Sequence, residues 1–235
     1  MTAPTILFDL DGTLLSTAAD LLASLNFIMG REGLRPLGAE EVGHQFGQGA
    51  RAMIVHGYGL NRMQVEASRL DDLTELFVAH YAENMPGETT LFPGLVEALD
   101  RLEAAGMRLA VCTNKREDLA LRLLGRLGIL ARFKAVGGGD SFPFRKPQGK
   151  HLVMTVKRAG GDPARAVMIG DSSSDILGAK EAGIPSIAVP FGYSDQPVAS
   201  FGPDLIIKDY AELTAEAIER LLQARSATAK QNRAG

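Results

Sequence analysis

The stretch that decides the fold runs from Ile6 to Leu15 and reads ILFDLDGTLL. It begins within an apolar run, Thr5 to Phe8, which follows Pro4 and is typical of a fully buried strand. Asp9 and Asp11 come where that strand should end. Residues i and i+2 of a strand point to the same side, so the two carboxylates are expected to converge at the carboxyl edge of a sheet. Like charges held close repel, so such a site needs a cation or a shared proton.

Composition excludes several classes of protein. The chain has 235 residues, 46% hydrophobic and 23% charged, as is usual for a globular protein. The net charge is −3 and acidic and basic residues are interspersed, so no basic surface that would bind nucleic acid is expected. No apolar run approaches the ~18 residues of a membrane span, and no secretory signal is expected. The single cysteine, Cys112, excludes an internal disulfide and favours a reducing compartment, so we expect a cytoplasmic protein.

The chain divides into two regions with different hydrophobic patterns. Between Leu14 and about Tyr81, apolar residues recur at helical spacing and no segment is typical of a strand. From Leu91 onward, strands alternate with helices, which predicts a mostly parallel sheet with helices on both faces. The first strand has no partner nearby in sequence and must join the later strands. The predicted fold class is therefore α/β, a Rossmann-like doubly wound sheet core (residues 1–15 and 89–235) with an inserted all-helical cap domain (residues 16–88).

The later elements follow from the same patterns. The expected strands are Arg108–Thr113, Phe133–Val136, Ala166–Ile169, Ser186–Val189 and Asp204–Ile207. The expected helices of the core are Leu95–Ala105, Asp118–Leu127, Gly149–Ala159, Ser174–Ala182 and one that begins near Leu213. The polar tail after Arg225 is expected to fray.

Four polar groups follow the predicted strands. They are Asp9 with Asp11, Thr113 with Asn114, Arg145 with Lys146, and Asp171 with Asp175. In a parallel sheet, all four would lie on one rim. Carboxylate oxygens suit Mg²⁺, whereas lysine, hydroxyl and backbone amides suit a phosphoryl group. Because the chain lacks the glycine motifs that bind nucleotides, the pattern predicts a phosphoryl-transfer site of another kind.

In these residues, the chain resembles the haloacid dehalogenase superfamily. Its four motifs are matched, in order, by Asp9-Leu10-Asp11-Gly12-Thr13, Thr113, Lys146-Pro147 and Gly170-Asp171-x-x-x-Asp175. A helical cap between the first and second motifs is also that superfamily's pattern. Within it, the chain is most similar to phosphoglycolate phosphatases, through Val111-Cys112-Thr113-Asn114-Lys115, Gly138-Gly139-Asp140-Ser141, Arg145-Lys146-Pro147, Phe92-Pro93-Gly94 and Phe191-Gly192-Tyr193. Ser172-Ser173-Ser174 departs from those enzymes, which more often have larger polar residues there.

The resemblance implies a Mg²⁺-dependent phosphatase that acts on a small-molecule phosphate monoester, with 2-phosphoglycolate as the expected substrate. Asp9 would be the nucleophile and form an aspartyl-phosphate. Asp11 would protonate the leaving oxygen and then activate water, its proton favoured by the surrounding carboxylates. Lys146 would neutralise charge.

The resemblance also assigns binding roles. Mg²⁺ would be held by Asp9, the carbonyl of Leu10 and Asp171, and the other candidate metal residues are Asp11 and Asp175. Thr113 and the Asn114 amide would bind phosphoryl oxygens, together with Lys146. Asp175 would orient the metal's waters or Lys146, although Ser172-x-x-Asp175 is also typical of a capping box at a helix start.

The cap should supply specificity. Phosphoglycolate carries a second anion, and Arg51, in Gly47-Gln48-Gly49-Ala50-Arg51, is the candidate to bind it, although an ordinary surface arginine is an equally good interpretation. Other functions remain open: a sugar-phosphate phosphatase, a β-phosphoglucomutase-like phosphomutase, or, from another class, a phospho-aspartate signalling module. Apart from the substrate, the expected partner is at most a second copy of the chain.

Overall fold

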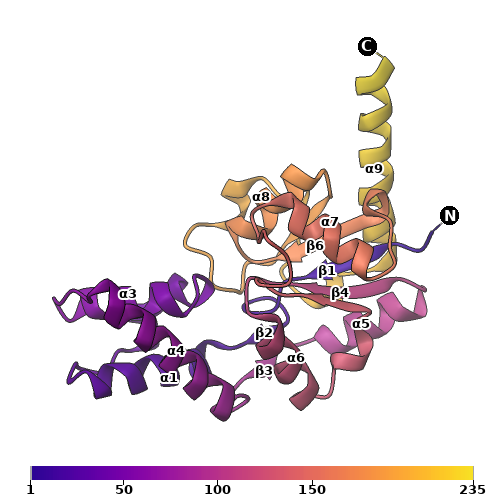
Figure 1. Cartoon of the computed structure of the whole chain (residues 1–235). Coiled ribbons are helices and arrows are strands. Elements are labelled where there is room, and N and C mark those ends of the chain that lie inside the picture. Colours follow the sequence, from indigo (N-terminus) through magenta and orange to yellow (C-terminus); the bar gives the residue numbers. More distant parts are fainter. Residues whose placement is uncertain (1, 235) are drawn as a thin grey trace.

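A six-stranded parallel sheet forms the centre of the protein (Figure 1). The computed structural model describes the backbone of residues 2–234 and the side chains of residues 2–225. The strand order is β5-β4-β1-β6-β7-β8, and every neighbouring pair is parallel. The strands are β1 (Thr5–Phe8), β4 (Arg108–Cys112), β5 (Ala135–Gly137), β6 (Ala166–Gly170), β7 (Ser186–Ala188) and β8 (Leu205–Ile206). As expected, β1 joins the later strands, with Phe8 level with Val111 of β4 and Ile169 of β6.

Helices cover both faces of this sheet. Successive residues of β1 point to opposite faces, so Ile6 and Phe8 belong to one core cluster and Leu7 belongs to the other. The first cluster contains residues of α5 (Leu95–Ala104), α6 (Glu117–Arg126) and α9 (Ala215–Ala234). The second contains residues of α7 (Gly149–Arg158) and α8 (Ser173–Ala182). Figure 1 shows α7 and α8 on one side of the sheet and α5 and α6 on the other, which confirms the doubly wound α/β fold.

The insertion after β1 is helical. Its helices are α1 (Ala18–Arg31), α2 (Ala39–Val42), α3 (Ala50–Leu60) and α4 (Ala67–Asn84). Helices α1, α3 and α4 pack against one another, beside the core (Figure 1). The two connections to the core form a small antiparallel ladder, β2 (Leu15–Ser16) with β3 (Thr90–Leu91). The prediction that this region contains no strand was therefore wrong, because a two-residue strand paired with a distant segment leaves no alternating pattern.

Asp20 of α1 holds the second connection in place. Its carboxylate is 8% exposed and accepts hydrogen bonds from the backbone N–H of Gly87 (2.9 Å), Glu88 (2.7 Å) and Thr89 (3.3 Å). The Thr89 hydroxyl donates a further bond at 2.5 Å. The buried Asp20 carboxylate thus links the start of α1, which follows the first connection, to the second connection.

Most predicted elements are present, with ends shifted by a residue or two. The largest change is at the carboxyl end, where α9 continues to Ala234 although the polar tail was expected to fray. Alanine, lysine, glutamine and arginine, which are frequent in that tail, all have high helix propensity, so a polar composition alone does not end a helix. Among the described residues, no helix is both long and apolar enough to cross a bilayer.

Candidate active site

Three carboxylates meet at the carboxyl edge of the sheet. Asp9 directly follows β1, Asp171 directly follows β6, and Asp175 lies in the first turn of α8. One oxygen of each lies within 4.8 Å of the others. The exposed fractions are 8%, 2% and 0%, so three acids share a volume almost free of bulk water. Because β1 and β6 are paired in parallel, their ends bring Asp9 and Asp171 together as the sequence predicts.

Lys146 lies inside this group. Its ammonium is 2.8 Å from Asp9 Oδ1 and 2.6 Å from Asp175 Oδ1, and the residue is only 2% exposed. The Asn114 side chain donates a hydrogen bond of 3.0 Å to the Lys146 carbonyl and so links the loop after β4 to this lysine. Burial alone would lower the pKa of Lys146, but Asp175 and Asp9 outweigh it and raise that pKa well above its ordinary value. Lys146 is therefore a permanent cation.

Asp171 is oriented by two donors. The Thr13 hydroxyl donates to Oδ1 and the backbone N–H of Tyr193 donates to Oδ2, each at 2.7 Å. The chain passes so close to this carboxylate that a Cβ on Gly12 or Gly192 would lie 2.4 or 2.2 Å from Oδ2. Glycine is required at both positions, and the Asp171 side chain cannot turn away from the site.

Asp175 combines both roles that the sequence left open. Its Oδ2 accepts hydrogen bonds from the backbone N–H (3.0 Å) and hydroxyl (2.6 Å) of Ser172, as in a capping box at the start of α8. Its Oδ1 is left for Lys146. The cap therefore fixes the carboxylate in the orientation that pairs it with the lysine.

The acidic group fits a bound divalent metal. Burial raises the pKa of Asp9 to about 6 against the opposing charge of Lys146. Burial, with Asp9 and Asp175 adding to it, raises the pKa of Asp171 to about 8. Asp9 Oδ1 is buried, and its ion pair with Lys146 is its only polar contact among the described residues. Three carboxylates with one ammonium leave negative charge to balance, and a donor set made only of oxygens suits a hard cation.

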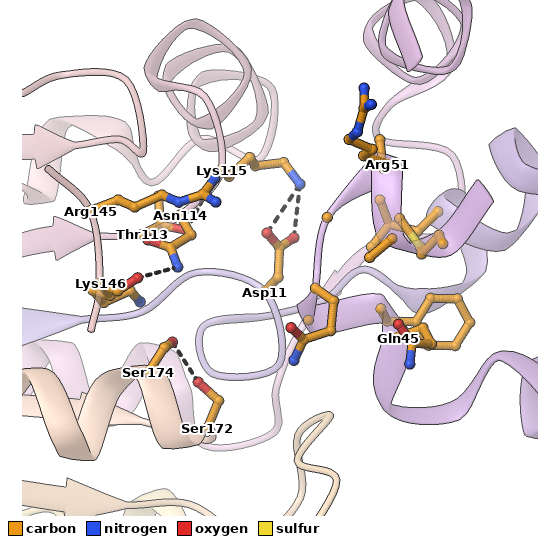
Figure 2. A pocket seen from close by; sticks show the side chains of 18 of the residues that line it. Asp11, Gln45, Arg51, Thr113, Asn114, Lys115, Arg145, Lys146, Ser172 and Ser174 are labelled. Atoms are coloured by element: carbon orange, nitrogen blue, oxygen red, sulfur yellow. Dashed lines mark hydrogen bonds and ion pairs between the residues drawn. The ribbon is translucent and has the colours of Figure 1, made fainter. Parts of the chain in front are cut away.

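Asp11 lies apart from this group. Both its oxygens accept hydrogen bonds from the Lys115 ammonium, at 2.9 and 3.1 Å (Figure 2). Asp11 was predicted to be a candidate metal residue surrounded by carboxylates, but it lies outside the group of three acids and is paired with the Lys115 ammonium. The Leu10 carbonyl, expected to bind the metal, accepts a hydrogen bond of 2.9 Å from the Leu15 N–H. The turn at Gly12, with φ of 82°, redirects the chain directly after Asp11.

A cleft of about 1090 Å³ lies between this rim and the helical block. Its core wall includes Asp9, Asp11, Thr113, Asn114, Lys115, Arg145, Lys146 and Asp171, and its other wall includes Phe46, Arg51, Met53, Phe77 and Tyr81. Thr113 is 1% exposed, and its hydroxyl accepts a hydrogen bond of 3.2 Å from the Lys115 N–H. Arg51 reaches the cleft from α3, but it is paired with Asp71 and its side chain is 54% exposed. Figure 2 shows the Arg51 head group directed away from Asp11.

Comparison with known proteins gives the family. The model of the haloacid dehalogenase-like hydrolases matches residues 6–189. The chain belongs to this family. It is 46% identical to a phosphoglycolate phosphatase of Agrobacterium fabrum, over 97% of each chain. It is 44% identical to one of Mesorhizobium japonicum, over 95% of this chain and 99% of that one.

A solved structure also matches closely. The crystal structure of a predicted phosphoglycolate phosphatase from Haemophilus somnus superposes with a TM-score of 0.83 at 29% identity and covers 91% of this chain and 97% of that one. Haloacid dehalogenase-like phosphatases are generally metal-dependent, which agrees with the buried acidic group.

Sequence reasoning missed four residues of this site. Thr13 and Tyr193 lie within quoted motifs, but their contacts with Asp171 depend on turns that bring distant segments together. Lys115 also lies within a quoted motif, two residues after Thr113, but no role was assigned to it. Tyr81 was interpreted as one of the residues of an apolar helix face, and no pattern places it against Lys115.

Proposed function

We propose that this haloacid dehalogenase-like hydrolase is a Mg²⁺-dependent phosphatase that hydrolyses 2-phosphoglycolate. The observation that carries the proposal is the buried contact of Asp9 with Lys146 beside two further carboxylates. The choice of substrate is supported by three phosphoglycolate phosphatases that are 42–46% identical to this protein over most of the chain. The wider partner class, a small-molecule phosphate ester, follows from the same chemistry.

The reaction demands charge stabilisation above all. Phosphate monoester hydrolysis is so slow that enzymes can accelerate it by up to ~10²¹-fold. In the proposed first step, Asp9 attacks phosphorus, the bond to the ester oxygen breaks, and Asp11 gives its proton to that oxygen. In the second, Asp11 takes a proton from water, which attacks the aspartyl-phosphate and releases inorganic phosphate. Held by Asp9 and Asp171, with Asp175 nearby, Mg²⁺ would supply positive charge at the phosphoryl oxygens.

The remaining residues hold the reactants. Lys146 keeps Asp9 in place and opposes the repulsion between its carboxylate and the phosphoryl group. The Thr113 hydroxyl already accepts a hydrogen bond from the Lys115 N–H, which leaves its own proton for a phosphoryl oxygen. We also assign the Asn114 backbone N–H to the phosphoryl group, since its side chain is engaged with Lys146.

The domain division is part of the proposal. Residues 16–88 would act as a cap that closes over the core, formed by residues 1–15 and 89–235, and excludes water from the cleft. The β2–β3 ladder and the Asp20 contacts mark the place where the two parts join. We further propose a cytoplasmic protein that acts as a monomer or homodimer.

The decisive experiment measures inorganic phosphate released from a panel of phosphate esters, with and without Mg²⁺. The native protein should prefer 2-phosphoglycolate and require the metal, and Asp9→Asn should lower the rate by at least ~10³-fold. Asp72→Asn, at a side chain that is 73% exposed, is the matched control and should behave as the native protein.

Each alternative has its own outcome. Undiminished release by Asp9→Asn would remove the nucleophile from the proposal. Preference for a bulky sugar phosphate would remove phosphoglycolate and retain the phosphatase chemistry. Return of the phosphoryl group to a sugar, without free phosphate, would indicate a phosphomutase.

A further inference from the structure

Lys115 holds an unusual position in the cleft. It lies in the loop after β4, and its ammonium is 2.9 and 3.1 Å from the two oxygens of Asp11. The same ammonium is 4.4 Å from the centre of the Tyr81 ring, which belongs to α4 of the helical block. The Lys115 side chain is only 7% exposed, yet it lines the cleft. The Lys115 ammonium is thus a nearly buried cation that lies between the core wall and the helical wall of the cleft (Figure 2).

Tyr81 gives a second and independent observation. The residue is 2% exposed and lines the same cleft, and its buried hydroxyl has no hydrogen-bond partner among the residues that the structure describes. The Lys115 ammonium lies over the Tyr81 ring in cation–π contact. A buried donor without an acceptor is costly, and such groups are rare in native proteins. Burial raises the pKa of Tyr81 to about 12, so the phenol keeps its proton and can donate it to an anion.

The proposed substrate carries an anion at this place. In the reaction described above, on which this inference rests, Asp11 contacts the ester oxygen of the substrate. In 2-phosphoglycolate the carboxylate is joined to that oxygen through a single methylene. A cation that touches Asp11 therefore stands next to the position of the carboxylate. We propose that the Lys115 ammonium and the Tyr81 hydroxyl together bind the carboxylate of the substrate, with Lys115 giving up one of its bonds to Asp11.

Other cations of the cleft are less well placed. Arg51 is paired with Asp71, and Arg116 is paired with Asp118; both arginine side chains are 54% exposed. Lys146 is already shared between Asp9 and Asp175. A charged hydrogen bond made by a buried ammonium is stronger than one made by a hydrated guanidinium.

Arg145 remains as a rival. It lines the cleft and is exposed, and Figure 2 shows it on the same side as Asn114. Together with Arg51, it supplies the matched cation controls for the experiment.

The experiment compares kcat/KM for 2-phosphoglycolate with that for 2-hydroxyethyl phosphate, which replaces the carboxylate by a neutral group. Lys115→Met should lower this ratio by about 10- to 100-fold, the range expected for a lost hydrogen bond to a charged group. Both substrates will react more slowly in this variant because Lys115 also holds Asp11, and the ratio separates the two effects. Tyr81→Phe keeps the ring beneath the ammonium and should lower the ratio about fivefold, through KM.

The outcomes are distinct. An unchanged ratio in both Lys115→Met and Tyr81→Phe, with melting temperatures showing folded variants, would refute the inference. A ratio lowered by Arg51→Met or Arg145→Met in their place would put the carboxylate elsewhere and refute it too. A native enzyme that hydrolyses both esters equally would exclude a carboxylate site and keep the phosphatase chemistry. A native enzyme that hydrolyses neither would overturn the proposed function and, with it, this inference.

Discussion

Replacing Lys146 by methionine should destabilise the protein strongly, and by an amount that depends on pH. The Lys146 side chain is 1% exposed and its ammonium contacts both Asp9 and Asp175. Methionine fills similar space but leaves buried carboxylates without their cation. Removing one partner of a buried ion pair costs ~3–5 kcal/mol. For a chain of 235 residues each kcal/mol lowers the melting temperature by ~2–4 °C, so a decrease of roughly 6–20 °C is expected.

The sign of the pH dependence follows from the carboxylates. Burial already raises the pKa of Asp9 to about 6, with Lys146 opposing the rise, so loss of Lys146 raises that pKa further. Protonated carboxyl groups no longer need a cation. The difference in melting temperature between native protein and Lys146→Met should therefore be large at pH 8 and small at pH 5. Saturating Mg²⁺ should also reduce it at pH 8.

The measurement is thermal unfolding followed by circular dichroism at the two pH values, with a chelator or with Mg²⁺. Lys150→Met is the matched control, since Lys150 is an exposed residue in the first turn of α7, shortly after Lys146 in the sequence. It should change the melting temperature by no more than a degree or two. A loss in Lys146→Met that is equal at pH 5 and pH 8, or no greater than the loss in Lys150→Met, would refute the reasoning.

Two further predictions concern the metal. The pKa values of Asp9 and Asp171 are raised from 3.8 to about 6 and about 8, so the metal-free native state binds more protons than the unfolded chain. The stabilisation from these bound protons is complete below pH ~3.8 and is lost as pH rises through 6 to 8. Because Mg²⁺ binds the deprotonated carboxylates, the gain in melting temperature on adding Mg²⁺ should grow from pH 5 to pH 9. A gain in melting temperature that is the same at pH 5 and pH 9 would contradict this prediction. Gly192→Ala places a Cβ 2.2 Å from Asp171 Oδ2 and should abolish most of that gain and at least ~90% of phosphate release, whereas Gly59→Ala, in α3 with open space around it, should do neither. Normal stabilisation of Gly192→Ala by Mg²⁺ would show that Asp171 is not a ligand.

The core was predictable because its signals are local. Each strand is a short apolar run, and the polar residue that matters follows it directly, as Asp9 follows β1 and Asp171 follows β6. A parallel sheet then places these residues on one rim without further information. The fold class and the acidic core of the candidate site could therefore be predicted from the sequence.

The neighbours of individual side chains were less predictable. Asp9 and Asp11 are two residues apart and line the same cleft, but nothing in the sequence indicated that Asp11 pairs with Lys115 outside the group of three acids. Arg51 was interpreted either as the partner of a second anion or as an ordinary surface arginine, and no sequence pattern indicated its pairing with Asp71 of another helix. In each case the deciding contact joins segments that are far apart along the chain.

The sequence alone determined the order of strands and helices, the helical insertion and the acids and lysine at the strand ends. It could do so because hydrophobic periodicity and the residues that follow a strand are properties of neighbouring positions. Three contacts became visible only in the folded protein: Lys146 lies between Asp9 and Asp175, Asp20 binds the second connection, and Tyr81 contacts Lys115 across the cleft. Those contacts depend on how separate elements pack and on which charges are buried together, and packing of this kind has no period along the chain.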